Sequence, residues 1–105
     1  MSSHPHLRRS QAQEKRAATA FGGTVNSGSG NGVYRKNDVR TPQFSIELKT
    51  TTKRQYPLKA DELAKAERHA LLDGRTMLFG IEMCGRNWMV LSEEDLLEIL
   101  GKESL

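Results

Sequence analysis

The stretch FSIELKTT, Phe44 to Thr51, alternates apolar and polar side chains along its first six residues. In an extended chain, successive side chains point to opposite faces of the strand. The two faces hold Phe44, Ile46 and Leu48 on one side and Ser45, Glu47 and Lys49 on the other. This pattern predicts a strand with one face in the core. A half-buried strand with a solvated outer face would explain an isolated Glu-x-Lys, so the rest of the chain must decide whether these charges take part in chemistry.

The segments around this strand predict a three-stranded meander followed by a helix-strand-strand-helix unit. Glycines, prolines and turn residues separate segments whose apolar period is 3.6 in the helices and 2 in the strands. The predicted elements are a helix at about 11–21, strands at 24–26, 33–40 and 43–51, a helix at 61–73, strands at 76–83 and 88–91, and a helix at 93–100. This order predicts an α/β fold with an α-β-β-β-α-β core, in which helices flank a mixed central sheet.

Capping residues predict the ends of the two later helices. Asp61 is the predicted N-cap of the first of them, and Gly74 lies just past its end. Ser92 and Asp95 form an S-x-x-D cap for the last helix, which Gly101 ends.

Chain length and cysteine content limit the class of protein. A chain of 105 residues has the size of a single small domain. We expect residues 1–9 to be a disordered basic tail and residues 10–105 to form the domain. Cys84 is the single cysteine and cannot form an intramolecular disulfide. No apolar run approaches the roughly 20 residues that span a bilayer, and the chain start lacks a signal-peptide h-region, so we expect a cytoplasmic protein without a membrane partner.

Basic residues concentrate in the first part of the chain. Residues 1–59 hold eleven Lys or Arg against three acids, a net charge of +8, whereas residues 60–105 hold five against ten. Clustered cations attract the phosphates of nucleic acids, although an unevenly charged solvated surface has the same composition. The candidate DNA-binding residues are Arg8, Arg9, Lys15, Arg16, Arg35, Lys36, Arg40, Lys53 and Arg54.

Two acids of the basic part are placed to meet. Asp38 precedes the Glu47 strand, and in a tight antiparallel pair their carboxylates lie on one face. Like charges held close repel each other unless a cation lies between them. Mg²⁺ prefers such oxygens, so Asp38, Glu47 and a backbone carbonyl, assigned to Leu48, are candidate ligands. Lys49 lies two residues beyond Glu47, about 6.6 Å along the same face, where its ammonium can reach a bound phosphate.

The segment before Asp38 adds a third acid and a flexible loop. Glu14 lies on or beside the apolar stripe of the first predicted helix, which is an unusual position for a carboxylate. The glycine-rich loop that follows this helix contains NSGSG, and its backbone can approach a ligand closely.

Asp38, Glu47 and Lys49 form the pattern D-x(8)-E-x-K, which resembles the PD-(D/E)XK nuclease motif at the matching place of its core. With Glu14 and the NSGSG loop, the chain resembles the archaeal-type Holliday junction resolvases and their bacteriophage relatives over residues 10–100. The resemblance implies a restriction-endonuclease-like fold.

The resemblance also implies roles for individual residues. The three acids Glu14, Asp38 and Glu47 would gather Mg²⁺, with Mn²⁺ as a substitute, and Lys49 would assist hydrolysis. Either Ser27 or Ser29 would contact the cleavage centre. The protein would be a homodimeric endodeoxyribonuclease that acts on four-way DNA junctions in recombination, in the host cytoplasm if it is phage-encoded. A nuclease for flaps, ends or duplex DNA and a non-catalytic DNA-binding module of the same fold are the alternatives.

A few positions depart from the family pattern or allow two interpretations. Asn37 stands where the family more often has proline or glycine. Related nucleases place a Gln or Lys on the next helix, and only Lys65 qualifies here, although a solvated helix lysine is the simpler interpretation. Phe79 and Trp88 are expected in the core, and Tyr34 stays open as a platform for stacking on a base.

The expected dimer needs an apolar interface. A C2 dimer supplies two identical sites, which match the two incisions that a four-way junction requires. The chain has more apolar surface than a small domain can cover, and this surface lies in residues 77–81, residues 88–91 and the leucine-rich last helix. We therefore expect the interface there.

Overall fold

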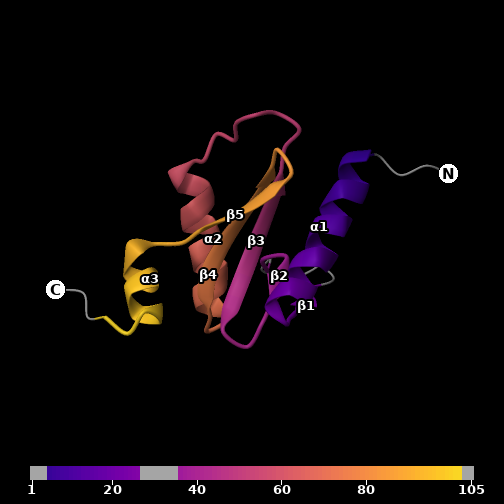
Figure 1. Ribbon diagram of the computed structural model, residues 1–105. Helices are drawn as coiled ribbons and strands as arrows, with labels where there is room; N and C mark the ends of the chain where they lie inside the picture. The colour runs from indigo at the N-terminus through magenta and orange to yellow at the C-terminus, as the bar shows by residue number, and fades with distance from the viewer. Residues whose placement is uncertain (1–4, 27–35, 103–105) are drawn as a thin grey trace.

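The computed structural model describes residues 5–26 and 36–102. Within these residues the helices and strands follow the predicted order. They are α1 (Pro5–Phe21), β1 (Thr24–Val25), β2 (Val39–Arg40), β3 (Phe44–Thr50), α2 (Ala60–Leu72), β4 (Thr76–Met83), β5 (Arg86–Val90) and α3 (Glu93–Ile99). Together they form a small α/β domain with a five-stranded mixed sheet and three helices (Figure 1).

The five strands lie in the sheet in chain order, from β1 to β5. β1, β2 and β3 form an antiparallel meander, and β4 and β5 form an antiparallel hairpin. β3 and β4 are parallel. A parallel connection needs a crossover, and α2 supplies it. β3 is therefore the central strand, with the meander on one side and the hairpin on the other.

α1 and α2 cover opposite faces of this sheet. Because side chains alternate along β4, this strand contributes to both cores, whereas the apolar side chains of β3 lie in the α1 core. The α1 core contains Ala17, Ala18, Val39, Ile46, Leu48 and Leu78. The α2 core contains Ala66, Ala70, Met77, Phe79 and Ile81. Phe79 is fully buried, which confirms its predicted place in the core.

The starts of the first two helices differ from the predictions. α1 begins at Pro5 and not near residue 11, so residues 5–9 are helical and do not belong to a disordered tail. Proline suits the first turn of a helix because no intrahelical partner is needed for its nitrogen. α2 begins at Ala60 after Lys59, and the prediction that Asp61 is its N-cap is wrong. Asp61 lies in the first turn, where a negative charge stabilises the helix dipole.

The predicted cap of α3 is confirmed. The backbone N–H of Asp95 donates to Ser92 Oγ over 3.0 Å, and Gly101 follows the helix with a φ of 75°. A positive φ at this position is typical of the glycine that ends a helix.

The predicted burial of the last strand and of the interface needs correction. Trp88 lies on the edge strand β5 with 45% of its surface exposed, so its expected core position is wrong. The guanidinium of Arg86 lies 4.6 Å from the centroid of the Trp88 ring. Residues 77–81 are all buried within the chain and cannot supply the exposed interface predicted for them. By contrast, α3 has no buried residue.

Every helix in the described part of the chain is too short or too polar to cross a lipid bilayer.

Candidate active site

The site begins where β2 ends beside β3. Val39 pairs with Ile46 across the two strands, and one step further along the same register Asp38 comes opposite Glu47. Oδ2 of Asp38 accepts a hydrogen bond of 2.9 Å from the backbone N–H of Leu48. Beyond the end of β2, this side-chain hydrogen bond replaces the backbone pairing with β3. The bond holds the Asp38 carboxylate against the Glu47–Leu48 segment.

The carboxylates at this position influence one another. Burial, followed by the neighbouring charge of Asp38, raises the pKa of Glu47 to about 7, although Lys49 and Lys65 oppose the rise. Burial and the charge of Asp38 also raise the pKa of Glu14 on α1. The structure therefore brings the three predicted acids into one electrostatic group with Asp38 at its centre.

Lys49 lies between two carboxylates. Its Nζ is 3.6 Å from Oε2 of Glu47 and 3.5 Å from Oε2 of Glu62 on α2. The Tyr56 hydroxyl donates to Glu62, with distances of 2.9 and 3.1 Å to the two oxygens. Burial, followed by the hydrogen bond and charge of Glu62, raises the pKa of Tyr56 to about 12, so the tyrosine stays a donor at neutral pH.

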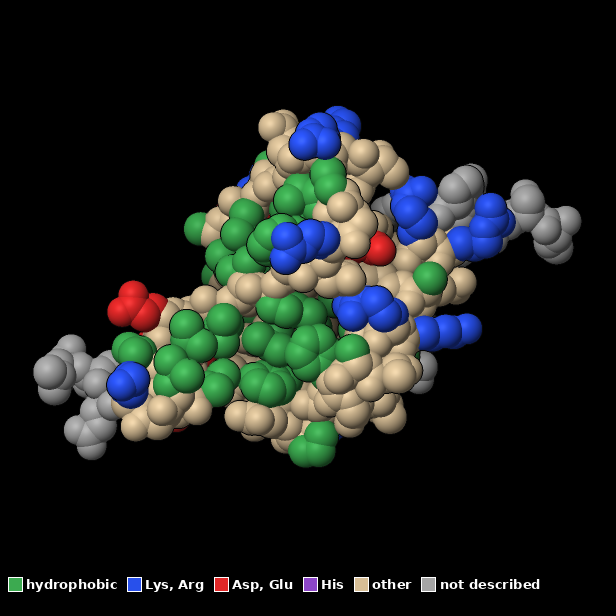
Figure 2. Space-filling view, in the orientation of Figure 1, with side chains coloured by type: hydrophobic (Ala, Val, Ile, Leu, Met, Phe, Trp, Pro, Cys, Tyr) green, Lys and Arg blue, Asp and Glu red, His purple; other side chains and the backbone are tan. Residues whose placement is uncertain are grey.

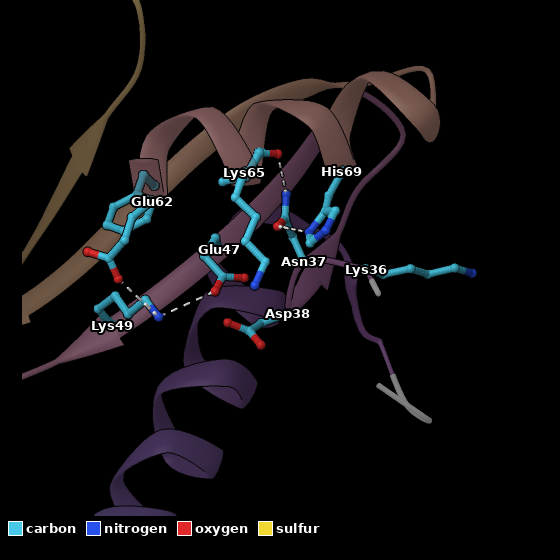
Figure 3. A pocket seen from close by; sticks show the side chains of 10 residues that line it. Lys36, Asn37, Asp38, Glu47, Lys49, Glu62, Lys65 and His69 are labelled. Carbon is cyan, nitrogen blue, oxygen red and sulfur yellow. Dashed lines mark hydrogen bonds and ion pairs between the residues drawn. The ribbon is translucent and has the colours of Figure 1, made fainter. Parts of the chain in front are cut away.

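Asp38, Glu47, Lys49 and Glu62 line a cavity of about 210 Å³ between β3 and α2, whereas Glu14 and Tyr56 are not among its lining residues (Figure 3). The Lys65 side chain comes from α2 and points toward Glu47 and Asp38 (Figure 3). Lys65 thus belongs to the cavity although the residue remains exposed, and the simpler interpretation of a solvated lysine misses this orientation. The cavity is lined by Lys36, Asn37, Asp38, Glu47, Lys49, Glu62, Lys65, Ala66, His69 and Phe79.

Asn37 fixes the approach to Asp38. Its side chain is 1% exposed, and its Nδ2 donates to Ser45 Oγ over 2.9 Å and to the Ala66 carbonyl over 3.0 Å. Its Oδ1 lies 3.3 Å from Nδ1 of His69. The Asn26 side chain donates to the Asn37 carbonyl over 2.7 Å. These hydrogen bonds fix the bend of the chain just before Asp38.

Gln13 fixes α1 against the same strand. This residue is 4% exposed, and its Nε2 donates to the Lys49 carbonyl over 2.7 Å. Glu14 is the next residue along α1, so the bond also sets the distance of that acid from the cavity.

Several of these residues were missed by the sequence analysis. On α2, Glu62 and His69 were missed, whereas Lys65 was considered as the candidate helix lysine; the three recur at spacings of three and four residues, which places them along one side of the helix. That polar stripe facing the Glu47 strand was the available signal. Gln13 and Tyr56 carry no comparable signal because nothing in their local spacing points to β3 or α2.

The remaining predicted site residues lie in different surroundings. Arg40 forms an ion pair with Asp73 over 3.3 Å. Lys36 lines the cavity but extends away from it (Figure 3). Lys53 and Arg54 are exposed in the loop after β3, and Figure 2 shows Lys and Arg side chains over this upper part of the molecule and beside α1. The predicted residues outside the described part of the chain are Ser27, Ser29, Tyr34 and Arg35.

The donor set fits a hard cation in part. No group of three or more His, Cys, Asp or Glu side chains within residues 5–26 and 36–102 is arranged to hold a metal ion. These residues do provide the Asp38 and Glu47 carboxylates with the Leu48 backbone beside them. Because the pKa of Glu47 is raised to about 7, protons and a divalent cation would compete for this pair. The carboxylate chemistry suits Mg²⁺.

Comparison of the chain with protein-family models, curated proteins and solved structures finds no match. The site is a polar cavity beside the central strand, in which three carboxylates and the two lysines Lys49 and Lys65 lie close together (Figure 3).

Proposed function

We propose that this chain is a metal-dependent, structure-selective DNA endonuclease of the PD-(D/E)XK type, and specifically a Holliday junction resolvase. The observation that supports this proposal is the meeting of Asp38, Glu47 and Lys49 in one solvent-accessible cavity. A buried carboxylate whose pKa is raised by burial and by a neighbouring carboxylate, as Glu47 is beside Asp38, is costly to a fold unless it has a function. A cation site is the function that their chemistry suits.

The proposed mechanism assigns each residue a role in phosphodiester hydrolysis. Asp38, Glu47 and the carbonyl of Leu48 would hold Mg²⁺, with Glu14 as a further acid beside Asp38. When bound, the ion would supply a Lewis acid and lower the pKa of water. The Lys49 ammonium, held between two carboxylates, would donate to a phosphate oxygen and offset the charge that develops there.

DNA is the proposed substrate because the basic part of the chain contributes Lys36 and Lys49 to this cavity. Residues 1–59 carry the net charge of +8, and Lys36 stands at the cavity itself. Phosphate binding by clustered Lys and Arg is the main source of affinity for DNA. Junction selectivity follows from a C2 dimer with two such cavities, as the resemblance implies.

We place the proposed dimer interface on α3 and the neighbouring face of the sheet. Leu96, Ile99 and Leu100 are 44%, 44% and 58% exposed. Figure 2 shows hydrophobic side chains gathered over this lower left region and across the neighbouring sheet face. Exposed apolar surface of this kind is typical of a protein–protein interface.

The alternatives differ in what the cavity does. A nuclease for flaps, ends or duplex DNA would use the same residues on another substrate. A non-catalytic DNA-binding module would gain affinity by losing the acids from its basic part, since carboxylates repel phosphate. The retained acids therefore favour an enzyme.

The test incubates the purified protein with four-way junction, flap, single-stranded and duplex DNA, each labelled on every strand. We expect paired incisions in opposed strands of the junction with Mg²⁺ or Mn²⁺, and binding with little cleavage with Ca²⁺. Preferred cleavage of flaps or duplex would support the alternative nuclease, and binding without cleavage under every metal would support the module. Full activity in a chelator would rule out the metal mechanism.

A further inference from the structure

A second hollow lies between the N-terminal half of α1 and the end of β3. Its volume is about 600 Å³, and it shares no lining residue with the catalytic cavity. α1 contributes Arg9, Ala12 and Arg16, the chain at the end of β3 contributes Thr50 to Thr52, and β4 contributes Glu82. The proposed catalytic roles use none of these side chains.

The α1 side of this groove presents two guanidinium groups. Arg9, Ala12 and Arg16 recur at helical spacing, so they lie along one side of α1. The small Ala12 between them leaves room for a ligand. Nε of Arg16 is buried, and no acceptor in the described part of the chain lies within hydrogen-bonding distance of it. A buried donor without a partner is destabilising, and an acceptor supplied by a ligand would remove that penalty.

The β3 side of the groove presents hydroxyl groups. Thr50 donates to Oε1 of Glu82 over 3.2 Å, which engages the one carboxylate of the groove. The Thr51 hydroxyl oxygen accepts from the N–H of Lys53 over 3.1 Å, which leaves its hydrogen for another acceptor. Two guanidiniums against one carboxylate leave the groove positive. Paired guanidiniums with nearby hydroxyl donors are well suited to the oxygens of a phosphodiester.

We infer that this groove is a second nucleic-acid contact that binds a phosphodiester of the DNA backbone through Arg9, Arg16 and the threonine hydroxyls. The inference rests on the proposed function, because it takes DNA to be the substrate. Gln13 joins the two sites, since it lines the groove and donates to the Lys49 carbonyl. A phosphate in the groove would therefore fix α1 and β3 relative to each other beside the catalytic lysine.

The experiment compares Arg9→Gln, Arg16→Gln and the double variant with Arg68→Gln, which removes a cation from the exposed side of α2 outside both cavities. Junction affinity is measured by fluorescence anisotropy in Ca²⁺ at several salt concentrations. We expect each groove variant to bind about tenfold more weakly and to lose about one counterion from the salt slope. Arg68→Gln should match the wild type both in junction affinity and in the rate of Mg²⁺-dependent cleavage.

A second measurement locates the contact on the DNA. Single phosphates of the junction are replaced one at a time by neutral methylphosphonates. We expect one position per protomer whose neutralisation weakens binding to the wild type but not to the double variant. Thermal unfolding of each variant checks that the fold is retained, and Arg16→Lys, which keeps the charge but loses the planar fork, should recover only part of the affinity.

The outcomes separate the groove from the enzyme. If the wild type cuts junctions and the groove variants bind them as Arg68→Gln does, the groove inference is overturned and the proposed function stands. If the wild type binds no form of DNA, the proposed function fails and the groove inference fails with it. If the variants change only the oligomeric state, the groove binds a carboxylate of a second copy and the inference is overturned.

Discussion

In the cavity between β3 and α2 the polar side chains hold one another in place, whereas the apolar side chains of α3 project largely into solvent. Asn37 is 1% exposed and its amide contacts two other elements, while Leu100 is 58% exposed. Both arrangements cost stability, because buried carboxylates repel each other and exposed leucines remain hydrated. A protein that folds only for stability would use its polar and apolar residues the other way round, which is why we propose a ligand for the cavity and a second copy of the chain for α3.

The largest expected effect is the loss of cleavage in Asp38→Asn. Removal of this charge takes away the acid at the centre of the carboxylate group, and we expect the cleavage rate at saturating junction DNA to fall at least about a thousandfold, or roughly 4 kcal/mol. Junction binding should persist or tighten because an anion is lost near phosphate. Asp61→Asn in the exposed first turn of α2 is the matched control. Parallel loss of binding and cleavage in a folded Asp38→Asn protein would contradict the assignment.

The next effect concerns the partner that positions Lys49. Glu62→Gln removes one of the two carboxylates that hold the Lys49 ammonium, whose Nζ lies 3.5 Å from Oε2 of Glu62. We expect single-turnover cleavage to slow by about ten- to a hundredfold. Tyr56→Phe should act in the same direction but less, since Glu62 then keeps its charge. Junction affinity should not change in either variant. Glu67→Gln, exposed on α2, is the control, and an equal loss of rate there would remove any special role for Glu62.

The third effect is on folding stability within the cavity. Asn37→Ala leaves the Ala66 carbonyl and the Ser45 hydroxyl without their donor, and we expect a loss of about 2 kcal/mol in the free energy of unfolding. Urea denaturation measures the change. Asn87→Ala on the exposed edge strand should alter stability by less than about 0.5 kcal/mol. Equal losses in the two variants would mean that the Asn37 hydrogen bonds do not stabilise the fold.

The fourth effect depends on pH. Because the pKa of Glu47 is about 7 in the folded chain against 4.5 ordinarily, the folded state binds more protons between these values and loses stability as the pH rises through them. Glu47→Gln removes this loss, so without metal it should be more stable than the wild type above pH 7, and the difference should shrink toward pH 4.5. With 25% of the side chain exposed, we expect about 1–2 kcal/mol.

Denaturation in chelator at several pH values measures this difference. Glu98→Gln on the exposed α3 is the control and should show no such pH dependence. A constant difference between Glu47→Gln and the wild type from pH 5 to pH 8 would show that Glu47 does not titrate with a raised pKa.

The smallest effect on stability is expected on α3. Leu100→Asp should change the unfolding free energy of the isolated chain by less than about 0.5 kcal/mol, because the side chain is already 58% exposed. Its effect should appear in assembly, where light scattering should show a dimer of the 11.8 kDa wild-type chain and a monomer of the variant. Leu71→Asp, on α2 and 78% exposed, is the control and should stay dimeric. A wild-type monomer that makes two coordinated cuts per junction would contradict the symmetry argument.

The sequence by itself determined the order of the elements, because each is encoded in local spacing. The two-residue period of the Phe44 strand and the Ser92 cap appear in the structure as predicted. The meeting of Asp38 and Glu47 also followed from sequence, since a short antiparallel turn separates them. Weak local signals failed: Pro5 began α1 earlier than its composition indicated, and Trp88 lies on an edge strand whose exposure no spacing reveals.

Only the tertiary structure decided which other side chains complete the cavity. The contact between Asn37 and His69 joins residues 32 apart in the chain, and that between Gln13 and Lys49 joins residues 36 apart. Periodicity reports which face of its own element a residue occupies, but it does not report which distant element covers that face. The placement of Glu62 beside Lys49 arises because α2 crosses over β3 to make the parallel pair with β4, and this crossover is a property of the assembled sheet.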